Sequence, residues 1–208
     1  MEQVLDVYKR PYDGKNPVVC MDESPKQLIG ETRIGSSMTP GKEKRIDYEY
    51  SRKGTCNIFM VNEPLAGKRR VKITETKTKL DWAELVKEIA DDDYPSADKI
   101  TLVMDNLNTH KPGSLYEKFE PREAKRILDR FEFVYTPKHG SWLNMAEIEL
   151  HVLNSQCLNR RIENMDIIIL ETMAWMNHRN NKIAKINWQF TTKDSRIKLK
   201  RLYPSIDG

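Results

Sequence analysis

Two short apolar segments of this chain each stop at an aspartate, and this feature most constrains its fold. Residues 17–21 read PVVCM and precede Asp22, while residues 100–104 read ITLVM and precede Asp105. Continuous apolar runs of this length are typical of strands that are buried on both faces. Loops diverge at the carboxyl ends of parallel strands and leave a crevice there. We therefore expect Asp22 and Asp105 to lie side by side at one edge of a sheet.

A structural reading of each aspartate stays open, because an Asp after a strand often serves as a turn former or a helix N-cap. The two residues together are more informative than either one, since both apolar runs stop at Asp and not at Asn, Ser or Gly.

The rest of the chain alternates between strand and helix patterns. Residues 46–51 and 56–62 are β-rich and flank RKGT, which predicts a hairpin with its turn at residues 52–55. Further strands are expected at residues 69–76, as an edge or third strand, and at residues 131–137. Helical spacing and start signals predict helices at residues 78–92, 121–130, 143–162, 164–181 and 191–204.

This order predicts an α/β fold of one domain, residues 1–208, because the chain has no internal repeat, low-complexity tract or Gly/Ser linker. The expected sheet is mixed, with three antiparallel strands plus two parallel ones and with helices on both faces.

A third acid, Glu147, lies near the start of the helix expected at residues 143–162. It shares a polar stripe with Asn144, His151 and Asn154. The neighbouring stripe is apolar and consists of Ala146, Leu150, Leu153 and Cys157. Glu147 is therefore expected to project into a crevice, although a solvated helical Glu gives the same pattern. Glu149 lies about 200° around the helix, so we expect it to face solvent.

Three converging carboxylates repel one another unless cations compensate their charge. Mg²⁺ prefers oxygen ligands and keeps waters for substrate phosphates. Two such ions can activate the attacking oxygen and stabilise the leaving oxygen in a phosphoryl displacement. The composition excludes structural zinc, because the three cysteines and four histidines are scattered. The cysteines are expected to be buried thiols in a reducing compartment.

Charge is unevenly distributed along the chain, whose net charge is +4. Residues 176–208 carry eight Lys or Arg against two Asp or Glu, which gives +6, and residues 1–175 therefore sum to −2. A basic tail suggests a polyanionic partner such as nucleic acid, although a solvated helix face produces the same count. No apolar run approaches a membrane span, and the N-terminus has no signal-peptide pattern, so a cytoplasmic protein is expected.

The motifs around the three acids resemble the catalytic domain of transposases of the mariner superfamily, in its bacterial insertion sequence 630 branch. They are VVCMDESP, LVMDNLNTH and TPKHGSWLNMAEIE, and DYEYSRKGTCNIF and INWQFTTKDSRIKLKRLYP support them. The resemblance implies a ribonuclease-H-like fold and a DDE-type enzyme with Asp22, Asp105 and Glu147 as catalytic, metal-binding residues. It also implies two Mg²⁺ ions, with Mn²⁺ as a substitute, and cut-and-paste DNA transposition at TA targets in the bacterial cytoplasm, associated with the nucleoid.

Members of this family carry helix-turn-helix modules before the catalytic domain, whereas this chain starts about 20 residues before the first expected strand. The resemblance therefore implies a fragment, a frameshifted half or an excised domain without that module. The expected partners are double-stranded DNA, a second copy in a homodimer or larger synaptic complex, and a separate N-terminal DNA-binding half. Two alternatives stay open: another ribonuclease-H-like endonuclease, and a truncated product that acts as a non-catalytic dimerising regulator.

Several polar residues outside the triad are candidates for contact with DNA. Asn106 and His110 follow Asp105 and are expected to orient phosphate or water, or else to stabilise their loop. Lys138 and His139 precede the catalytic helix and are candidates for backbone phosphate contacts. The basic C-terminal helix supplies Lys193, Arg196, Lys198, Lys200 and Arg201. Trp142, Trp175 and Trp188 either stack on bases or belong to the core.

Overall fold

The computed structural model describes residues 1–33, 40–41, 48–108, 110–138 and 140–203. Its centre is a single mixed sheet with the strand order β3-β2-β1-β4-β5. The strands are β1 (Val18–Glu31), β2 (Tyr50–Glu63), β3 (Lys68–Thr74), β4 (Ile100–Met104) and β5 (Phe131–Tyr135). Strands β1, β2 and β3 pair antiparallel, whereas β4 pairs parallel with both β1 and β5. The predicted combination of three antiparallel strands and two parallel strands is confirmed.

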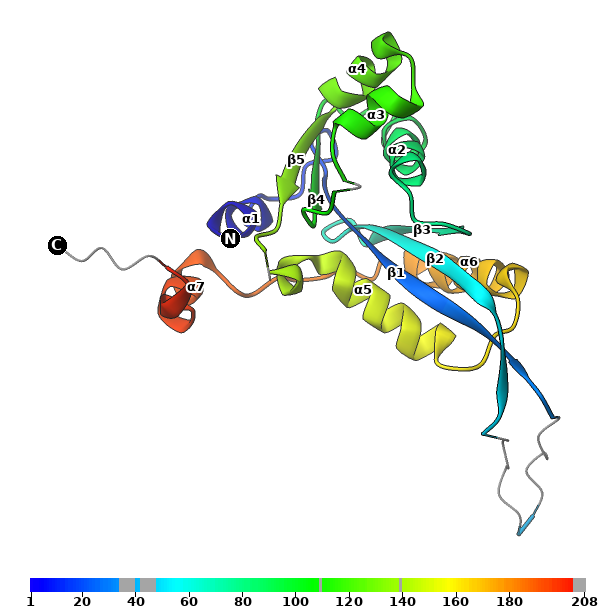
Figure 1. The fold of residues 1–208 in the computed structure, drawn as a ribbon. Coiled ribbons are helices and arrows are strands. Elements are labelled where there is room, and N and C mark those ends of the chain that lie inside the picture. The colour runs from blue at the N-terminus through cyan, green and yellow to red at the C-terminus, as the bar shows by residue number, and fades with distance from the viewer. Residues whose placement is uncertain (34–39, 42–47, 109, 139, 204–208) are drawn as a thin grey trace.

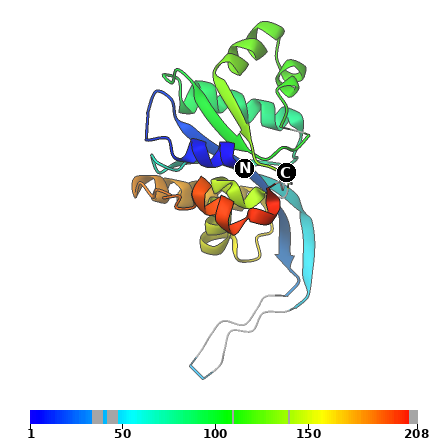
Figure 2. The same cartoon turned by 90° about the vertical axis from the view of Figure 1, so that its left-hand side faces the viewer.

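Helices cover both faces of the sheet, as predicted (Figure 1). One face carries α2 (Lys79–Glu88), α3 (Gly113–Lys118) and α4 (Pro121–Asp129), and the other carries α1 (Glu2–Tyr8), α5 (Met145–Leu153) and α6 (Met165–Asn181). A short C-terminal helix, α7 (Thr192–Lys198), lies beside α1 (Figures 1 and 2). The described residues also form four short helical turns: π-helical turns at Ile89–Asp93 and Asn154–Leu158, and 3₁₀ turns at Ser141–Leu143 and Lys200–Leu202. The first π-helical turn extends α2 and the second extends α5.

A turn at residues 64–67 connects β2 to β3. The Gly67 N–H donates to the Glu63 carbonyl at 3.0 Å, and the residue has a φ of +69°, a conformation that favours glycine. In the described part of the chain, no helix is long and apolar enough to cross a membrane.

The alternation of side chains along the strands produces one apolar core on each face of the sheet. Cys20 and Met60 point to the face that α1, α5 and α6 cover, and both are fully buried there. Their neighbours Met21 and Phe59 point to the opposite face, where they pack with α2, α3 and α4. Because the central strands are apolar on both faces, they read as continuous apolar runs in the sequence.

Polar side chains and a proline mark the starts of three helices, and of these signals the proline, Pro121, was predicted. Thr78 and Asp81 form a reciprocal capping box at the start of α2, and Pro121 occupies the first position of α4. The Asn164 side chain caps α6 by accepting from the Ile167 N–H at 3.0 Å. Helices α1 and α3 are too short, at seven and six residues, to show a helical period and were not predicted.

The hairpin turn predicted at residues 52–55 is wrong. Strand β2 runs through residues 52–55. Its register against β1 shifts between Leu28 and Ile29, because β2 has one extra residue there, which forms a bulge. Gly54 supports this bulge with a φ of +112°. A glycine in a bulge and a glycine in a turn look alike in sequence. Residues 46 and 47 of the first predicted strand lie outside the described residues.

Strand β1 and helix α5 also differ in length from the predictions. Strand β1 does not stop at Met21 but continues to Glu31, because β2 still pairs with it after β4 has ended. Helix α5 ends at Leu153 and its π-helical extension at Leu158, short of the predicted end at residue 162. The Ile29 N–H donates to the Ile162 carbonyl at 2.8 Å, so this segment follows β1 and leaves the helix axis.

Candidate active site

Asp22 and Asp105 leave two neighbouring parallel strands at the same level. Cys20 is the register partner of Val103, and each aspartate follows two residues later on its own strand. Adjacent strands lie about 4.8 Å apart, and residues two apart share a face of the sheet. Both aspartates therefore lie toward the face that α5 covers, just beyond the parallel pairing. Asp22 was predicted to follow the end of its strand, but β1 continues beyond it. Asp22 lies just after the part of β1 that pairs parallel with β4.

The Asp22 carboxylate is half-buried and surrounded by other acids. Its Oδ1 accepts a hydrogen bond from the Glu23 N–H at 2.8 Å. Burial is the largest cause that raises the pKa of Asp22 to about 7; the charges of Glu23, Asp105 and Glu147 add to the rise, and that hydrogen bond opposes it. Asp22 thus lies within electrostatic reach of the other two members of the predicted triad.

Helix α5 brings Glu147 to this cluster through a fixed N-cap. The Asn144 side chain is fully buried and accepts from the Ala146 N–H at 3.1 Å. Its Nδ2 donates to the carbonyl of Met21, the residue before Asp22, at 2.7 Å. Glu147 occupies the first turn of the helix, three residues after the cap, and its side chain is exposed. Asn144 was predicted as part of a polar stripe, but its role as the link between α5 and β1 was not predicted. An Asn directly before a helical pattern is the sequence signal for an N-cap.

Glu149 is buried, so the prediction that it faces solvent is wrong. Its side chain is only 1% exposed and contacts two cations, Arg69 of β3 at 3.1 Å and Arg179 of α6 at 2.8 Å. Arg69 also donates to the Ala184 carbonyl at 2.6 Å. Helical phase separates Glu147 from Glu149, but it does not reveal that β3 and α6 supply cations on the Glu149 side. The paired charges offset the cost of burial and fasten α5 to both elements.

His110 connects Asp105 to a second buried carboxylate. Its Nδ1 lies 2.7 Å from Asp105 Oδ1 and its Nε2 lies 3.1 Å from Glu23 Oε2. The imidazole is 1% exposed and stacks on Trp82, with ring centroids 6.0 Å apart. Glu23 also contacts Lys77 Nζ at 2.6 Å. Lys77, Glu23, His110 and Asp105 therefore form one chain of ionic contacts, which we call the Asp105 support chain.

Opposite charges in the Asp105 support chain stabilise the ionised forms. Burial lowers the pKa of His110, but the contacts with Asp105 and Glu23 outweigh it and raise the pKa to about 9. Burial raises the pKa of Glu23, but His110 and Lys77 outweigh it and hold the pKa below its ordinary value. The expectation that His110 contacts DNA disagrees with its burial, and its alternative role in stabilising the loop agrees with these contacts. Glu23 was not predicted; a second acid directly after Asp22, at the end of the apolar run 17–21, was its signal.

The sequence matches the family described as DDE superfamily endonuclease over residues 17–169, which is more than half of the chain. The chain belongs to the DDE superfamily of endonucleases. The matched range contains Asp22, Asp105 and Glu147. A search of curated proteins finds no match.

Solved structures of the Mos1 mariner transposase are similar in fold. The paired-end complex with Mn has a TM-score of 0.57 at 13% identity, over 88% of this chain and 56% of that chain. The paired-end complex with the left transposon end gives 0.58 at 14% identity, over the same shares. The strand transfer complex gives 0.55 at 12% identity, over 90% of this chain and 60% of that chain. The chain thus spans less than two thirds of these proteins, and the likeness confirms the predicted ribonuclease-H-like fold.

The oxygen donors of this DDE-family chain fit a hard divalent cation. Asp22, Asp105 and Glu147 offer carboxylates only, which are ligands that Mg²⁺ and Mn²⁺ accept. Burial and the charges of its acidic neighbours raise the pKa of Asp22, and a bound cation would offset both effects. Within the described ranges, no three His, Cys, Asp or Glu side chains already stand in a metal-holding arrangement.

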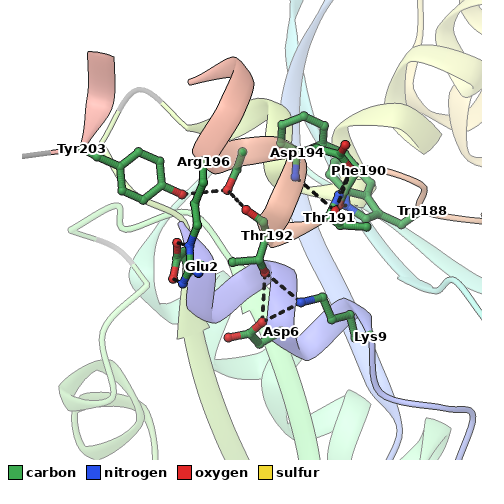
Figure 3. A network of polar contacts seen from close by, with 11 residues as sticks. Glu2, Asp6, Lys9, Trp188, Phe190, Thr191, Thr192, Asp194, Arg196 and Tyr203 are labelled. Carbon is green, nitrogen blue, oxygen red and sulfur yellow. Dashed lines mark hydrogen bonds and ion pairs between the residues drawn. The ribbon is translucent and has the colours of Figure 1, made fainter. Parts of the chain in front are cut away.

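The remaining candidates for DNA contact are spread over two regions. Asn106 and Lys138 are exposed in the loops that follow β4 and β5, on the side of the aspartates, and His139 lies outside the described residues. The C-terminal cations Lys193, Lys198, Lys200 and Arg201 are also exposed. Arg196 forms two contacts with Glu2, at 2.7 and 2.9 Å, which join α7 to α1 (Figure 3). The Asp6 carboxylate accepts from Thr192 Oγ1 at 3.0 Å and strengthens this junction (Figure 3).

Proposed function

We propose that this chain is the catalytic domain of a DNA transposase and that Asp22, Asp105 and Glu147 hold its divalent metal ions. One observation carries the proposal: the parallel register of β1 and β4 aligns Asp22 with Asp105, and Asn144 links the helix that carries Glu147 to the same strand. Membership of the DDE superfamily supports it.

The metal ions complete the chemistry of these acids. Two Mg²⁺ ions, for which Mn²⁺ substitutes, would when bound activate the attacking oxygen and stabilise the leaving oxygen of a phosphoryl displacement. Asp22 and Asp105 are the fixed donors, because both follow buried strand residues, and Glu147 approaches from α5. His110 is a positioning residue that orients Asp105 through the contact at Oδ1.

The proposed substrate is double-stranded DNA, which undergoes two successive displacements. In the first, a water oxygen bonds to phosphorus at an element end and the P–O3′ bond breaks, leaving a 3′-hydroxyl. In the second, this 3′-oxygen bonds to a target phosphorus and the target P–O3′ bond breaks, so that the strands are joined; we propose TA as the target. Both steps are in-line displacements, so one site can serve both. Similar Mos1 structures are a paired-end complex and a strand transfer complex, which supports this order.

The proposed assembly is a homodimer or larger synaptic complex on DNA, in the bacterial cytoplasm. The Mos1 paired-end complexes support such an assembly. Recognition of the element ends is assigned to an N-terminal DNA-binding part, which a separate chain is able to supply. The exposed cations Lys138, Lys193, Lys198, Lys200 and Arg201 would contact backbone phosphates, which carry no sequence information.

A strand-transfer assay in Mg²⁺ tests this function. A labelled DNA with a free 3′-hydroxyl at the element end is mixed with the chain and a target plasmid, with and without an added N-terminal DNA-binding module. Joined product supports the transposase. Cleavage without joining in both arms supports another ribonuclease-H-like endonuclease. No reaction in either arm, together with dimerisation of the chain, supports a non-catalytic regulator.

A further inference from the structure

Trp142 is an exposed aromatic side chain in the segment that leads into the helix of Glu147. It lies in the 3₁₀ turn Ser141–Leu143, five residues before Glu147, and 42% of it is exposed. A large aromatic ring gains most from burial, so a ring that the fold holds in place but leaves exposed is available for a ligand.

The protein supports the Trp142 ring with two other aromatic side chains. Trp188 stacks against it at a centroid distance of 6.5 Å and an interplanar angle of 20°, and Phe190 meets it edge-on at 5.6 Å. Trp188 is itself fixed, because its Nε1 donates to the Phe190 carbonyl at 2.7 Å (Figure 3). Tyr8 packs on Trp188 at 5.2 Å and donates to the Leu143 carbonyl at 2.7 Å. These contacts order the ring before any ligand arrives.

The position of Trp142 relates it to the three acids. The segment that carries it follows the carboxyl end of β5, which pairs parallel with β4, the strand that leads to Asp105. Two residues after Trp142, Asn144 donates to the Met21 carbonyl, next to Asp22. The turn that carries Trp142 therefore lies between the carboxyl end of β5 and the segment that carries Asp22.

Cations accompany the aromatic side chains. Lys138 is exposed four residues before Trp142, and Lys198 Nζ lies 5.8 Å from the centre of the Phe190 ring. Aromatic rings flanked by Lys or Arg are typical of surfaces that bind single-stranded nucleic acid, where the rings stack on bases and the cations attract phosphates. An apolar protein partner would gain nothing from these cations.

We propose that Trp142 is a stacking platform for an unpaired DNA base next to the cleaved phosphodiester. Bases inside a duplex are covered on both faces by their neighbours, so only an unpaired or terminal base offers a face to the ring. Stacking also tolerates any base, because each has a π-face. The inference rests on the proposed action of this chain on DNA. It adds that the site prefers DNA with an unpaired base next to the cleaved phosphodiester.

The test compares binding of two DNAs in EDTA, where no metal-dependent cleavage occurs. One is a blunt duplex, and the other carries an unpaired 2-aminopurine at its end, whose fluorescence falls when it stacks. The proteins are the wild-type chain, Trp142→Ala, Trp142→Phe and the control Tyr116→Ala, which removes an equally exposed aromatic side chain from α3. Thermal melting confirms that each variant is folded.

The wild-type chain should bind the unpaired end more tightly than the blunt duplex and quench its fluorescence. Trp142→Ala should lose about 5- to 150-fold in affinity for the unpaired end, with no quenching and with blunt-duplex binding unchanged. Trp142→Phe and Tyr116→Ala should retain the preference. Equal binding of both DNAs by the wild-type chain, or unchanged quenching in folded Trp142→Ala, would overturn the proposal. Because metal is absent, the platform can stand even if the chain proves unable to cleave DNA.

Discussion

The Asn144 side-chain amide donates to the Met21 carbonyl at 2.7 Å, which ties the N-cap of α5 to the residue before Asp22. The same side chain caps the helix that carries Glu147. One buried side chain therefore links the segments that carry Asp22 and Glu147, which are far apart in the sequence.

Replacing this residue should harm both stability and metal affinity. Asn144→Ala removes an N-cap and leaves the Met21 carbonyl unsatisfied, at a cost of about 2 kcal/mol in the free energy of unfolding. Urea denaturation measures this cost, and the rise of Tm on adding Mn²⁺ measures metal affinity. Asn154→Ala, at an exposed position after α5, is the control. If the Asn144 variant matches the control in both measurements, the link does not position Glu147.

Glu149 should contribute strongly to the free energy of unfolding through its contacts between α5 and its neighbours. Glu149→Ala leaves Arg69 and Arg179 without their buried partner, and breaking such a pair costs about 3–5 kcal/mol. Urea denaturation of this variant and of Glu75→Ala, which removes an exposed acid from the segment after β3, measures the difference. A loss of stability no larger than that of the control would contradict the burial of Glu149.

The metal-free protein should become less stable as the pH rises through the range in which Asp22 titrates. The ordinary pKa of Asp22 is 3.8, and burial raises the pKa to about 7 in the folded chain. Between these values the folded state retains a proton that the unfolded chain has released, so the contribution of Asp22 to stability falls with rising pH. This rise in pKa corresponds to at most about 4 kcal/mol, and partial solvent exposure reduces the amount.

In the metal-free protein, Asp22→Asn should therefore increase stability over the wild type at pH 8, and this gain should be smaller at pH 4. Melting of both proteins in EDTA at the two pH values measures this. Adding Mg²⁺ at pH 8 should raise the Tm of the wild-type chain and have little effect on the variant. An Asn variant that is less stable than the wild type at pH 8 in EDTA would show that the charge of Asp22 is already compensated in the fold.

His110→Gln should weaken the function of Asp105 without removing any metal ligand. Loss of a group that orients a ligand typically costs about 10- to 100-fold in metal affinity or activity. Mg²⁺ titrations of DNA cleavage measure the effect, and it should appear as a higher Mg²⁺ requirement. His151→Gln, which changes an exposed histidine on α5, supplies the comparison. Equal Mg²⁺ requirements in the two variants would leave His110 with a purely structural role.

Sequence patterns predicted the parts of this fold that depend on local periodicity. The apolar runs before Asp22 and Asp105 gave the two strands, and their parallel pairing followed from the order of strands and helices. The end of β1 was missed because the partner strand β2, and not the local pattern, decides where β1 stops.

The surroundings of the acids were less predictable, since they depend on residues from distant segments. The burial of Glu149 requires Arg69 and Arg179, which are 80 and 30 residues away. In the same way, His110 is held by Asp105, which is near in sequence, and by Glu23, which is not. Helical phase distinguishes the sides of α5 but does not tell which side other elements cover.

The most direct test of the central claim is Mg²⁺-dependent DNA cleavage by Asp105→Asn, measured beside the wild-type chain, with binding of the same DNA in EDTA as the control for folding. The substitution keeps the size of the side chain and removes the charge that the metal ions require. We predict that the wild-type chain cleaves and that the variant binds DNA equally well but shows no cleavage above background. Retained cleavage by the variant would contradict the assignment of Asp105, Asp22 and Glu147 as one metal site.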